Sequence, residues 1–228
     1  MIENYQAFDV GSPTGASVRL YPHLQYFWLG NFFATKILFY LCSQYTMQKR
    51  LILNPDLLSI TINRLCHQLI ENHSSFENTV LVGLQPRGSF LLDLIAPQLK
   101  ILTGVEVTHG YLDSTFYRDD FRRRDIAPKA HETKMDFVVE DKDVILIDDV
   151  LFTGRSVRSA MDALLAFGRP NKVELLVLID RKYTRDIPLA PNYVGKEVNT
   201  LAHQKVLVQL EPEKQNKVWL INEENDAA

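Results

Sequence analysis

Hydrophobic residues in this chain follow two spacings, and the alternation between them predicts strands that alternate with helices. Short runs that are apolar at nearly every position are typical of strands buried on both faces. We predict such strands at residues 79–84, 105–112, 143–147, 172–179, 205–210 and 217–221, with a further short strand at 135–139. Between several of these runs, apolar residues recur every three or four positions, as they do on the buried face of a helix.

The predicted helices cover residues 54–72, 89–103 and 156–167. Asn54 stands before a proline, a pairing that often opens a helix. Pro97 lies inside the second helix and is expected to kink it. Gly104 and Gly168 follow the second and third helices and are typical of helix ends. Strands that alternate with helices indicate an α/β fold, with a mainly parallel sheet flanked by helices.

Residues 1–46 do not follow this pattern. The stretch 24–42 is mostly apolar and nearly long enough to cross a bilayer, but Lys36 would lie deep in the lipid at a cost of a few kcal/mol. Met47 opens a segment that has the character of a normal domain start. We interpret residues 1–46 as a poorly packed extension, added by translation from an upstream start, and residues 47–228 as the functional domain. A docking helix and a membrane anchor are the alternative interpretations.

Composition and charge exclude some classes of protein but do not identify a function. The hydrophobic share of 46% and charged share of 23% are ordinary for a soluble globular protein. The net charge of -3 gives no global attraction to nucleic acid or to an anionic membrane, so any such binding needs a local patch. Only Cys42 and Cys66 are present, which excludes a disulfide framework. We expect a cytoplasmic protein that does not bind membranes.

The most informative chemistry follows the strand at 143–147. Asp148 and Asp149 come first, and a bend rich in small and hydroxyl residues then opens the helix at 156–167. The residues after the acids are Val150, Leu151, Phe152, Thr153, Gly154, Arg155 and Ser156. Free backbone amides at a helix start attract phosphate, and adjacent carboxylates suit ribose hydroxyls or a hydrated divalent cation. A phosphorylated ribose would satisfy both halves; an ordinary helix cap beside surface acids is the alternative.

Two other segments are expected at the same edge of the sheet, because ligands of such folds bind at the carboxyl ends of the strands. The turn Gln85-Pro86-Arg87-Gly88 follows the strand at 79–84 and would hold an anion through Arg87 and its amides. The run 118–134 contains six basic and four acidic residues and would close over a pyrophosphate. A plain turn and a solvated loop are the respective alternatives.

The stretch Val144–Ser156 resembles the motif with which type I phosphoribosyltransferases bind 5-phosphoribosyl 1-pyrophosphate (PRPP). Within that superfamily, residues 47–221 are similar to the PyrR family, which combines pyr operon regulation with uracil phosphoribosyltransferase activity. The similarity includes residues 117–120, 148–156 with Arg158, 168–170, 180–181, 191–196 and 206–210. The resemblance implies the type I phosphoribosyltransferase fold, with a small hood at about residues 180–200.

The resemblance also implies a role for each matched position. Asp148, Asp149, Arg87 and Arg118 would form the catalytic group, with the two acids on the ribose hydroxyls. Residues 150–156 would bind PRPP, with Thr153–Ser156 around its 5′-phosphate, and Gln85, Pro86 and Gly88 would bind its pyrophosphate. Backbone groups of Tyr193 and Val194 would read the edges of uracil. Mg²⁺ would accompany PRPP, and no protein ligand is assigned to the ion. The products would be UMP and pyrophosphate, formed through a transition state resembling an oxocarbenium ion.

Two positions depart from related families. PyrR proteins commonly carry Lys-Thr where this chain has Gln85-Pro86, so a positive charge and a backbone donor are lost. Phe152 stands where purine phosphoribosyltransferases usually carry an acid facing the purine, which argues against a purine substrate. Dedicated uracil phosphoribosyltransferases begin the motif with Asp-Pro, so the chain is not placed among them.

Regulation is the second implied activity. PyrR proteins bind the pyr mRNA leader under control of uridine nucleotides, UMP and UTP, and do so as dimers. His67, Arg158 and Arg169 are the candidate RNA contacts, although a plain helix-surface histidine is the alternative for His67. We expect a homodimer or higher oligomer. The alternative functions are an RNA-binding or ligand-sensing regulator with negligible catalysis, and a phosphoribosyltransferase for another base.

Overall fold

The computed structural model describes residues 8–11, 17–20, 49–119, 130–201, 203–210 and 215–222. The chain divides into two units, Met1–Gln48 and Lys49–Ala228. In the first unit, β1 (Phe8–Gly11) and β2 (Ser17–Leu20) form an antiparallel pair. The apolar stretch 24–42 lies outside the described residues. No helix in the described part of the chain is long and apolar enough to cross a membrane.

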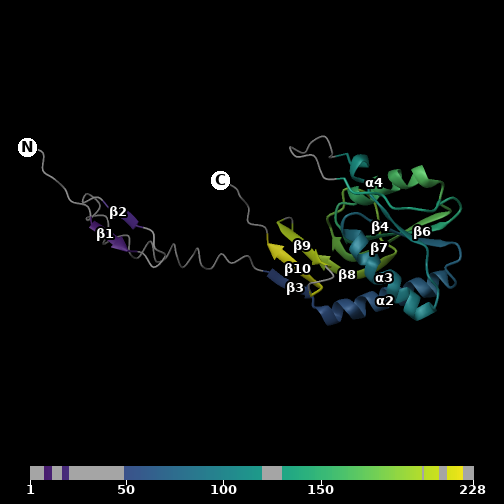
Figure 1. Cartoon of the computed structure of the whole chain (residues 1–228), viewed down its shortest axis with the longest axis horizontal. Coiled ribbons are helices and arrows are strands. Elements are labelled where there is room, and N and C mark those ends of the chain that lie inside the picture. Colours follow the sequence, from purple (N-terminus) through teal and green to yellow (C-terminus); the bar gives the residue numbers. More distant parts are fainter. Residues whose placement is uncertain are drawn as a thin grey trace, which may run out of the picture. The chain divides into compact units, whose positions relative to one another are not determined.

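The second unit is built around a five-stranded parallel sheet with the order β5-β4-β6-β7-β8 (Figure 1). Its strands are β4 (Thr79–Leu84), β5 (His109–Leu112), β6 (Asp143–Leu151), β7 (Lys172–Lys182) and β8 (Tyr193–Asn199). The predicted α/β fold with a parallel sheet is therefore confirmed. Because every strand runs the same way, the carboxyl ends of β4, β5 and β6 meet at one edge.

Helix α2 (Pro55–His73) begins as its sequence predicts. The Asn54 side chain accepts a hydrogen bond from the Leu57 amide at 2.8 Å, and Pro55 occupies the first helical position. Its buried residues recur at helical spacing: Leu58, Thr61, Ile62, Leu65, Cys66 and Leu69. This stripe places one face of α2 against the sheet and leaves the opposite face exposed.

Helix α3 (Arg87–Thr103) starts two residues earlier than its predicted start at Ser89 and continues through Pro97. Gly104 ends it in the left-handed conformation at φ 73°, with its amide bonded to the carbonyl of Lys100. Helix α4 (Arg155–Leu164) is followed by the 3₁₀ turn η4 (Leu165–Phe167), so the predicted helix at 156–167 is confirmed apart from its tighter last turn.

The helices cover opposite faces of the sheet, with α2 and α3 on one side and α4 on the other (Figure 1). Alternate residues of β6 serve the two cores. Ile145 and Ile147 pack with α2 and α3, whereas Val144 and Leu146 pack with α4. This division follows from the two-residue period of a strand buried on both faces.

A second, antiparallel sheet has the order β3-β10-β9. It consists of β3 (Lys49–Leu53), β9 (Gln204–Gln209) and β10 (Lys217–Asn222). The strands predicted at 205–210 and 217–221 are confirmed, whereas β3 and β8 were not predicted as strands. The hood expected at about 180–200 stays a prediction; this range contains the end of β7, the following loop and β8.

Two strand predictions need correction. Residues 135–139 form no strand, and the neighbouring Lys134 makes only an isolated bridge to Tyr111. Strand β5 begins at His109 rather than at Val105, because Val105 and Glu106 are exposed and the residue pairs between β4 and β5 start with Leu81 and His109. A short apolar run thus does not suffice for a strand where no neighbouring strand is available to pair with it.

Candidate active site

The site begins at the carboxyl end of β6, where the acid pair follows four buried apolar residues. Asp149 is 6% exposed, and its Oδ2 atom has no hydrogen-bond partner among the described residues. Asp148 receives a hydrogen bond on Oδ1 from the Asp149 amide at 2.9 Å. A buried carboxylate oxygen without a partner is costly, and such atoms are usually reserved for a ligand or an ion.

Burial changes the ionisation of both acids. Loss of water raises the pKa of Asp148 well above its ordinary value, and the neighbouring charge of Asp149 raises it further. Burial also raises the pKa of Asp149, although the Arg87 guanidinium opposes this effect. The pair therefore carries less negative charge than two free aspartates would, and a ligand that donates hydrogen bonds to it would favour the ionised form.

Arg87 and Gly88 bring the start of α3 against the acid pair. Arg87 Nη1 lies 3.9 Å from Asp149 Oδ2, and half of the arginine side chain is exposed. A Cβ atom added to Gly88 would lie 2.2 Å from the carbonyl oxygen of Ile147, so only glycine permits this close approach of the two backbones. The fold therefore joins the predicted turn to the predicted acids.

The two residues before Arg87 have different surroundings. The Gln85–Pro86 peptide is cis. Gln85 donates from Nε2 to the carbonyl of Glu132 at 2.6 Å, and its amide bonds to the carbonyl of Leu112 at 3.0 Å. Gln85 thus connects β4 to β5 and to the segment after residue 130. The predicted contact of this turn with pyrophosphate remains a prediction.

The bend Phe152–Ser156, here called the cradle, opens helix α4. Gly154 adopts the left-handed conformation at φ 89°, which favours glycine. The amides that begin α4 have no carbonyl partner inside the helix, whereas the Arg158 amide already bonds the Gly154 carbonyl at 3.0 Å. The positive end of the helix dipole lies at this start. Val150 and Leu151 precede the cradle and pack in the two cores, so their side chains are structural and only their backbone is available to a ligand.

Charged side chains from the segment after β5 reach the cradle. Arg118 donates from Nη1 to the Ser156 hydroxyl at 2.8 Å, which brings this predicted catalytic residue to the site. The Arg155 side chain forms ion pairs with Asp119 and with Asp186, at 3.0 Å to the latter, so it is turned toward these acids. The predicted closing segment at 118–134 is described only in part, because residues 120–129 lie outside the described residues.

Two features of the site were not predicted. Asp113, at the end of β5, accepts hydrogen bonds from the Thr115 amide at 2.9 Å and the His131 amide at 2.7 Å, and so joins both ends of the charged segment. An acid directly after an apolar strand, as at Asp148, was the signal for it. The second feature is the loop after β7, where Arg185 donates to the carbonyls of Leu151 and Phe152.

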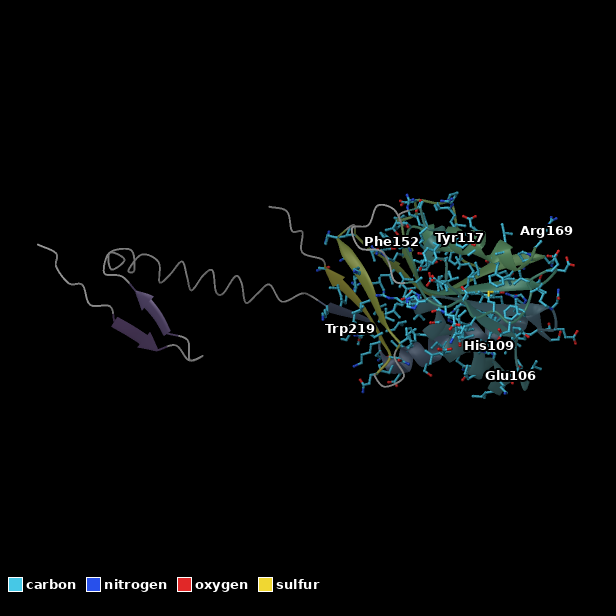
Figure 2. All side chains as sticks on the ribbon, turned by 45° about the horizontal axis from the view of Figure 1, so that its top comes forward. Glu106, His109, Tyr117, Phe152, Arg169 and Trp219 are labelled. Atoms are coloured by element: carbon cyan, nitrogen blue, oxygen red, sulfur yellow. The ribbon has the colours of Figure 1, made fainter. Side chains whose placement is uncertain are left out.

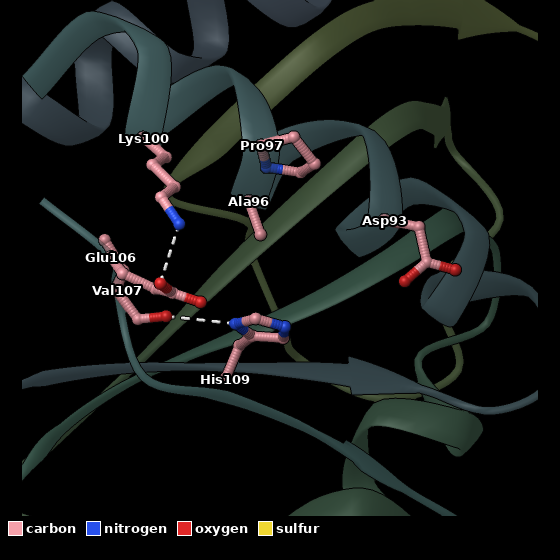
Figure 3. A pocket seen from close by; sticks show the side chains of 7 residues that line it. All are labelled: Asp93, Ala96, Pro97, Lys100, Glu106, Val107 and His109. Atoms are coloured by element: carbon pink, nitrogen blue, oxygen red, sulfur yellow. Dashed lines mark hydrogen bonds and ion pairs between the residues drawn. The ribbon is translucent and has the colours of Figure 1, made fainter. Parts of the chain in front are cut away.

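A pocket of about 310 Å³ lies away from this site, between α3 and the segment leading into β5 (Figure 3). Its charged groups are already partnered. Lys100 and Glu106 form an ion pair at 2.7 Å, and His109 Nδ1 lies 3.0 Å from the carbonyl of Val107. The Asp93 carboxylate, which also lines the pocket, accepts a hydrogen bond from the Tyr111 hydroxyl at 2.6 Å.

Comparisons with known proteins agree with this geometry. The family model described as "Phosphoribosyl transferase domain" matches residues 52–215. A protein named "Bifunctional protein PyrR" from Deinococcus radiodurans is 42% identical over 166 residues, which cover 73% of this chain and 90% of the relative. The protein of the same name from Bacillus subtilis is 38% identical over 178 residues, with 77% and 98% covered. The chain belongs to the PyrR family of phosphoribosyltransferases.

Solved structures support the same fold. A hypoxanthine phosphoribosyltransferase from Trypanosoma cruzi matches with a TM-score of 0.61 at 12% identity, over 78% of this chain and 93% of that one. A hypoxanthine phosphoribosyltransferase from Staphylococcus aureus gives a TM-score of 0.51 at 18% identity, over 69% and 81%. At such low identity these likenesses establish the fold alone, and they confirm the type I phosphoribosyltransferase architecture of this PyrR protein.

The residues predicted to contact uracil lie in β8. The Tyr193 side chain is 3% exposed, and its hydroxyl donates to Glu174 at 2.8 Å. The side chain is therefore bound inside the protein, and only the backbone of Tyr193 is available for the predicted contact with uracil. The carbonyls of Val194 and Gly195 accept hydrogen bonds from Arg64 at 3.1 and 2.6 Å.

Phe152 belongs to the cradle, and in the view of Figure 2 it lies apart from Arg169. The residue is 44% exposed, and the guanidinium carbon of Arg181 lies 3.9 Å from the centre of its ring. Arg181 is itself held by the Thr200 hydroxyl at 3.0 Å and the carbonyl of Gln204 at 2.8 Å. In this PyrR protein the Phe152 ring is thus packed against a buried arginine.

The candidate RNA contacts of this PyrR protein are not brought together within one copy. His67 is exposed on α2, whereas Arg158 is exposed on α4, across the sheet. Arg158 lies 3.7 Å from Asp119 and 3.8 Å from Asp162. Arg169 is exposed in the loop after η4, with its amide bonded to Glu140 at 2.6 Å. One copy therefore cannot present all three residues on a single face.

Proposed function

We propose that this PyrR protein is a uracil phosphoribosyltransferase, which transfers the 5-phosphoribosyl group of PRPP to N1 of uracil. UMP and pyrophosphate are the products. The observation that carries the proposal is the buried acid pair, in which Asp149 Oδ2 accepts no hydrogen bond from the described residues, placed between Arg87 and the cradle. Such a site offers acceptors for two ribose hydroxyls, backbone donors for a phosphate and a cation for a second anionic group.

Each group then has a task in the reaction. Asp148 and Asp149 hold the 2′ and 3′ hydroxyls of the ribose and keep C1′ in place for attack. The cradle amides hold the 5′-phosphate at the other end of the sugar. Arg87 stabilises the negative charge that grows on the departing pyrophosphate, and Arg118 acts beside Ser156. No side chain of this group is a general base for uracil, so positioning and stabilisation of the leaving group supply most of the rate.

The site also fits a magnesium ion that arrives with PRPP. No group of three or more potential metal-ligating side chains occurs in the described part of the chain. Mg²⁺ commonly takes one or two carboxylates and completes its shell with water and phosphate oxygens. Asp148 and Asp149 would hold the ion together with the oxygens of PRPP. When bound, it would neutralise charge on the pyrophosphate.

Uracil is the proposed base because of the surface around Phe152. Phe152 stands where purine phosphoribosyltransferases usually carry an acid that faces the purine, and its ring is held under the Arg181 guanidinium. A phosphoribosyltransferase for another base is the alternative. Incubation of the purified full chain with PRPP, Mg²⁺ and single bases should release pyrophosphate with uracil and not with hypoxanthine or guanine. Release with a purine and not with uracil would refute the assignment.

Replacement of Asp149 by Asn tests the site itself. We expect kcat/KM for PRPP to fall about 10- to 100-fold, because an amide replaces a charged acceptor of the ribose hydroxyls. The matched control is Asp56→Asn, an exposed acid in the first turn of α2, which should retain wild-type rates. Wild-type UMP formation by a folded Asp149→Asn protein would remove Asp149 from the mechanism.

Regulation through RNA is the proposed second activity, supported by the name "Bifunctional protein PyrR" that the relatives share. The proposed ligand is the pyr mRNA leader, bound under control of UMP and UTP. Because His67 and Arg158 lie on opposite sides of the sheet, a joint RNA surface would require two copies, in line with the expected homodimer.

Filter binding of a pyr leader RNA should therefore show UMP-enhanced affinity that falls steeply with salt. The triple variant His67→Ala, Arg158→Ala, Arg169→Ala should weaken RNA binding and leave UMP formation intact. The matched control is Lys142→Ala, which removes a cation outside the candidate set. No binding at low salt would contradict the second activity without affecting the first.

A further inference from the structure

The cradle is supported from behind by the loop after β7. Three consecutive carbonyls, those of Leu151, Phe152 and Thr153, accept hydrogen bonds from residues 185–187. The Arg185 guanidinium donates to Leu151 at 3.2 Å and to Phe152. The amides of Asp186 and Ile187 both donate to Thr153 at 3.1 Å. Residues 185–189, here called the bracket, thus bind the backbone of the cradle through side-chain and main-chain donors alike.

The orientation of the cradle amides follows from these bonds. In a trans peptide the N–H points opposite to the C=O of the same unit. Because the carbonyls of 151, 152 and 153 face the bracket, the amides of Phe152, Thr153 and Gly154 face away from it. They are directed to the side where a bound phosphate would accept hydrogen bonds. Three donors are therefore aligned before any ligand arrives.

Packing and charge reinforce the same arrangement. A Cβ atom at Gly154 would lie 3.2 Å from Leu189 and 3.5 Å from Ile187, so the bracket also touches the cradle through apolar side chains. The Asp186 carboxylate holds the Arg155 side chain at 3.0 Å and keeps it turned toward the bracket.

Arg185 is the centre of the bracket. Its side chain is 20% exposed, and besides the two cradle-side carbonyls it binds the carboxylate of Asp180, which is 4% exposed. It also donates to the carbonyls of Arg181 at 3.1 Å and Leu189 at 3.4 Å. A guanidinium can serve several acceptors in one plane, whereas an ammonium group cannot reproduce this fork.

We propose that Arg185 is a positioning residue that fixes the cradle for the 5′-phosphate. The inference rests on the proposed function and deepens it, because it concerns affinity for one end of the substrate. Arg185 touches the backbone of the cradle and acts on the phosphate only through it. Loss of Arg185 frees the carbonyls of Leu151 and Phe152 to turn and therefore weakens phosphate binding without altering chemistry at C1′.

Steady-state kinetics of Arg185→Lys test the proposal. This variant keeps a positive charge beside Asp180 and loses the fork. We expect KM for PRPP to rise about 10- to 100-fold, with kcat and KM for uracil changed less than about threefold. The matched control is Lys182→Met, which removes the other cation near Asp180, at 3.9 Å, and has no bond to the cradle. This control should keep the wild-type KM for PRPP.

A second readout separates positioning from a merely structural role. In Arg185→Ala, added guanidinium ion should lower the raised KM for PRPP, while wild type and Lys182→Met should not respond. If the Arg185 variants do not fold, Asp180→Asn replaces them, because it weakens the hold on Arg185 and leaves the guanidinium in place. It should raise the KM for PRPP by a smaller factor.

Calorimetric binding of UMP distinguishes this inference from the proposed function. If wild type binds UMP but forms none from uracil and PRPP, and Arg185→Lys binds it about tenfold more weakly or worse, the catalytic assignment fails and the positioning role stands. If wild type is active and Arg185→Lys has wild-type KM for PRPP and wild-type UMP affinity, the positioning role is refuted. The same result for folded Asp180→Asn refutes it where Arg185→Lys does not fold. A variant that loses kcat alone refutes it as well.

Discussion

At the scale of single residues, burial of the acid pair lowers the stability of the fold, although the same carboxylates are needed for the proposed binding. Asp148 and Asp149 lie at the end of a buried strand, and burial raises the pKa of both. Replacement by a neutral residue would remove this cost, yet the carboxylates are what the proposed sugar ligand requires. Groups with perturbed ionisation in this position are typical of functional sites rather than of structural ones.

The pH dependence of stability tests this view through Asp148→Asn. Because the folded-state pKa of Asp148 lies above its unfolded value, the folded protein binds more protons between the two values, and stability falls as pH rises through that interval. Near pH 8, Asp148→Asn should melt about 2–4 °C above wild type, which corresponds to roughly 1 kcal/mol in a domain of this size.

The difference in melting temperature should narrow near pH 5, where more of the wild-type population has Asp148 protonated. Calorimetric melting curves across this range provide the measurement, with Asp56→Asn as a control for the loss of an exposed acid. An Asp148→Asn protein less stable than wild type at every pH would contradict the cost assigned to this carboxylate.

At the scale of elements, the sequence predicts what is local and misses what depends on distant partners. The start of α2 was predictable because its cap and proline are adjacent, and the apolar run of β6 identified the central strand. Strand β8 was missed because only Tyr193 and Val198 are buried among polar neighbours. β7 continues past its apolar run because Asp180 and Arg181 are buried with polar partners, which an apolar pattern cannot reveal.

The same rule applies to the site. The acid pair and the cradle are contiguous in the chain, so the chemistry of each could be read from spacing and residue type. The bracket comes later in the chain and reaches the cradle by contacts that no local pattern encodes; Arg185 and Phe152 are 33 positions apart. Arg87 could be assigned to the site only because carboxyl ends of parallel strands meet at one edge.

A buried polar cluster joins α2, β7 and β8 and provides a prediction at this scale. Glu174 is 5% exposed; His73 Nε2 lies 2.7 Å from its carboxylate, the Tyr193 hydroxyl donates at 2.8 Å, and Lys172 forms an ion pair with it. Burial opposes ionisation of Glu174, but the hydrogen bonds from Lys172, Tyr193 and His73 outweigh it and lower the pKa. Glu174→Gln should therefore reduce the free energy of unfolding by about 1–3 kcal/mol at neutral pH.

Because the folded-state pKa of Glu174 is lowered, its contribution is present above the unfolded pKa and is lost as pH falls through the folded value. The difference between wild type and Glu174→Gln in urea unfolding should thus be constant at neutral pH and shrink below about pH 4. Glu197→Gln is the matched control, since its ion pair with Lys182 at 2.9 Å is exposed and worth at most about 1 kcal/mol. Equal effects of the two variants would show that burial of the cluster is unimportant.

At the scale of the whole molecule, the core on the α2 and α3 side of the parallel sheet contains residues of both sheets. It contains Ile52 and Leu53 of β3, residues of α2 and α3, and residues of β9 and β10, together with one face of the parallel sheet. Lys196 of β8 also donates to the carbonyl of Ile52 at 3.2 Å. β3 is therefore part of the folded body, and any dispensable extension has to end before Lys49. We propose residues 1–46 as that extension.

Two truncations decide whether the extension is dispensable. A chain that begins at Met47 keeps β3 whole and should match the full chain in melting temperature and in kcat/KM for PRPP. A chain that begins at Asn54 loses Ile52 and Leu53 from the core and leaves the edge of β10 unpaired. Each large apolar side chain removed from a core costs about 2–5 kcal/mol, a large part of the roughly 5–15 kcal/mol that stabilises a domain. The second truncation should therefore melt more than about 10 °C lower or fail to fold. If the chain from Met47 also lost stability or activity, residues 1–46 would have to contribute contacts to the catalytic body, and the extension would be a working part of the enzyme.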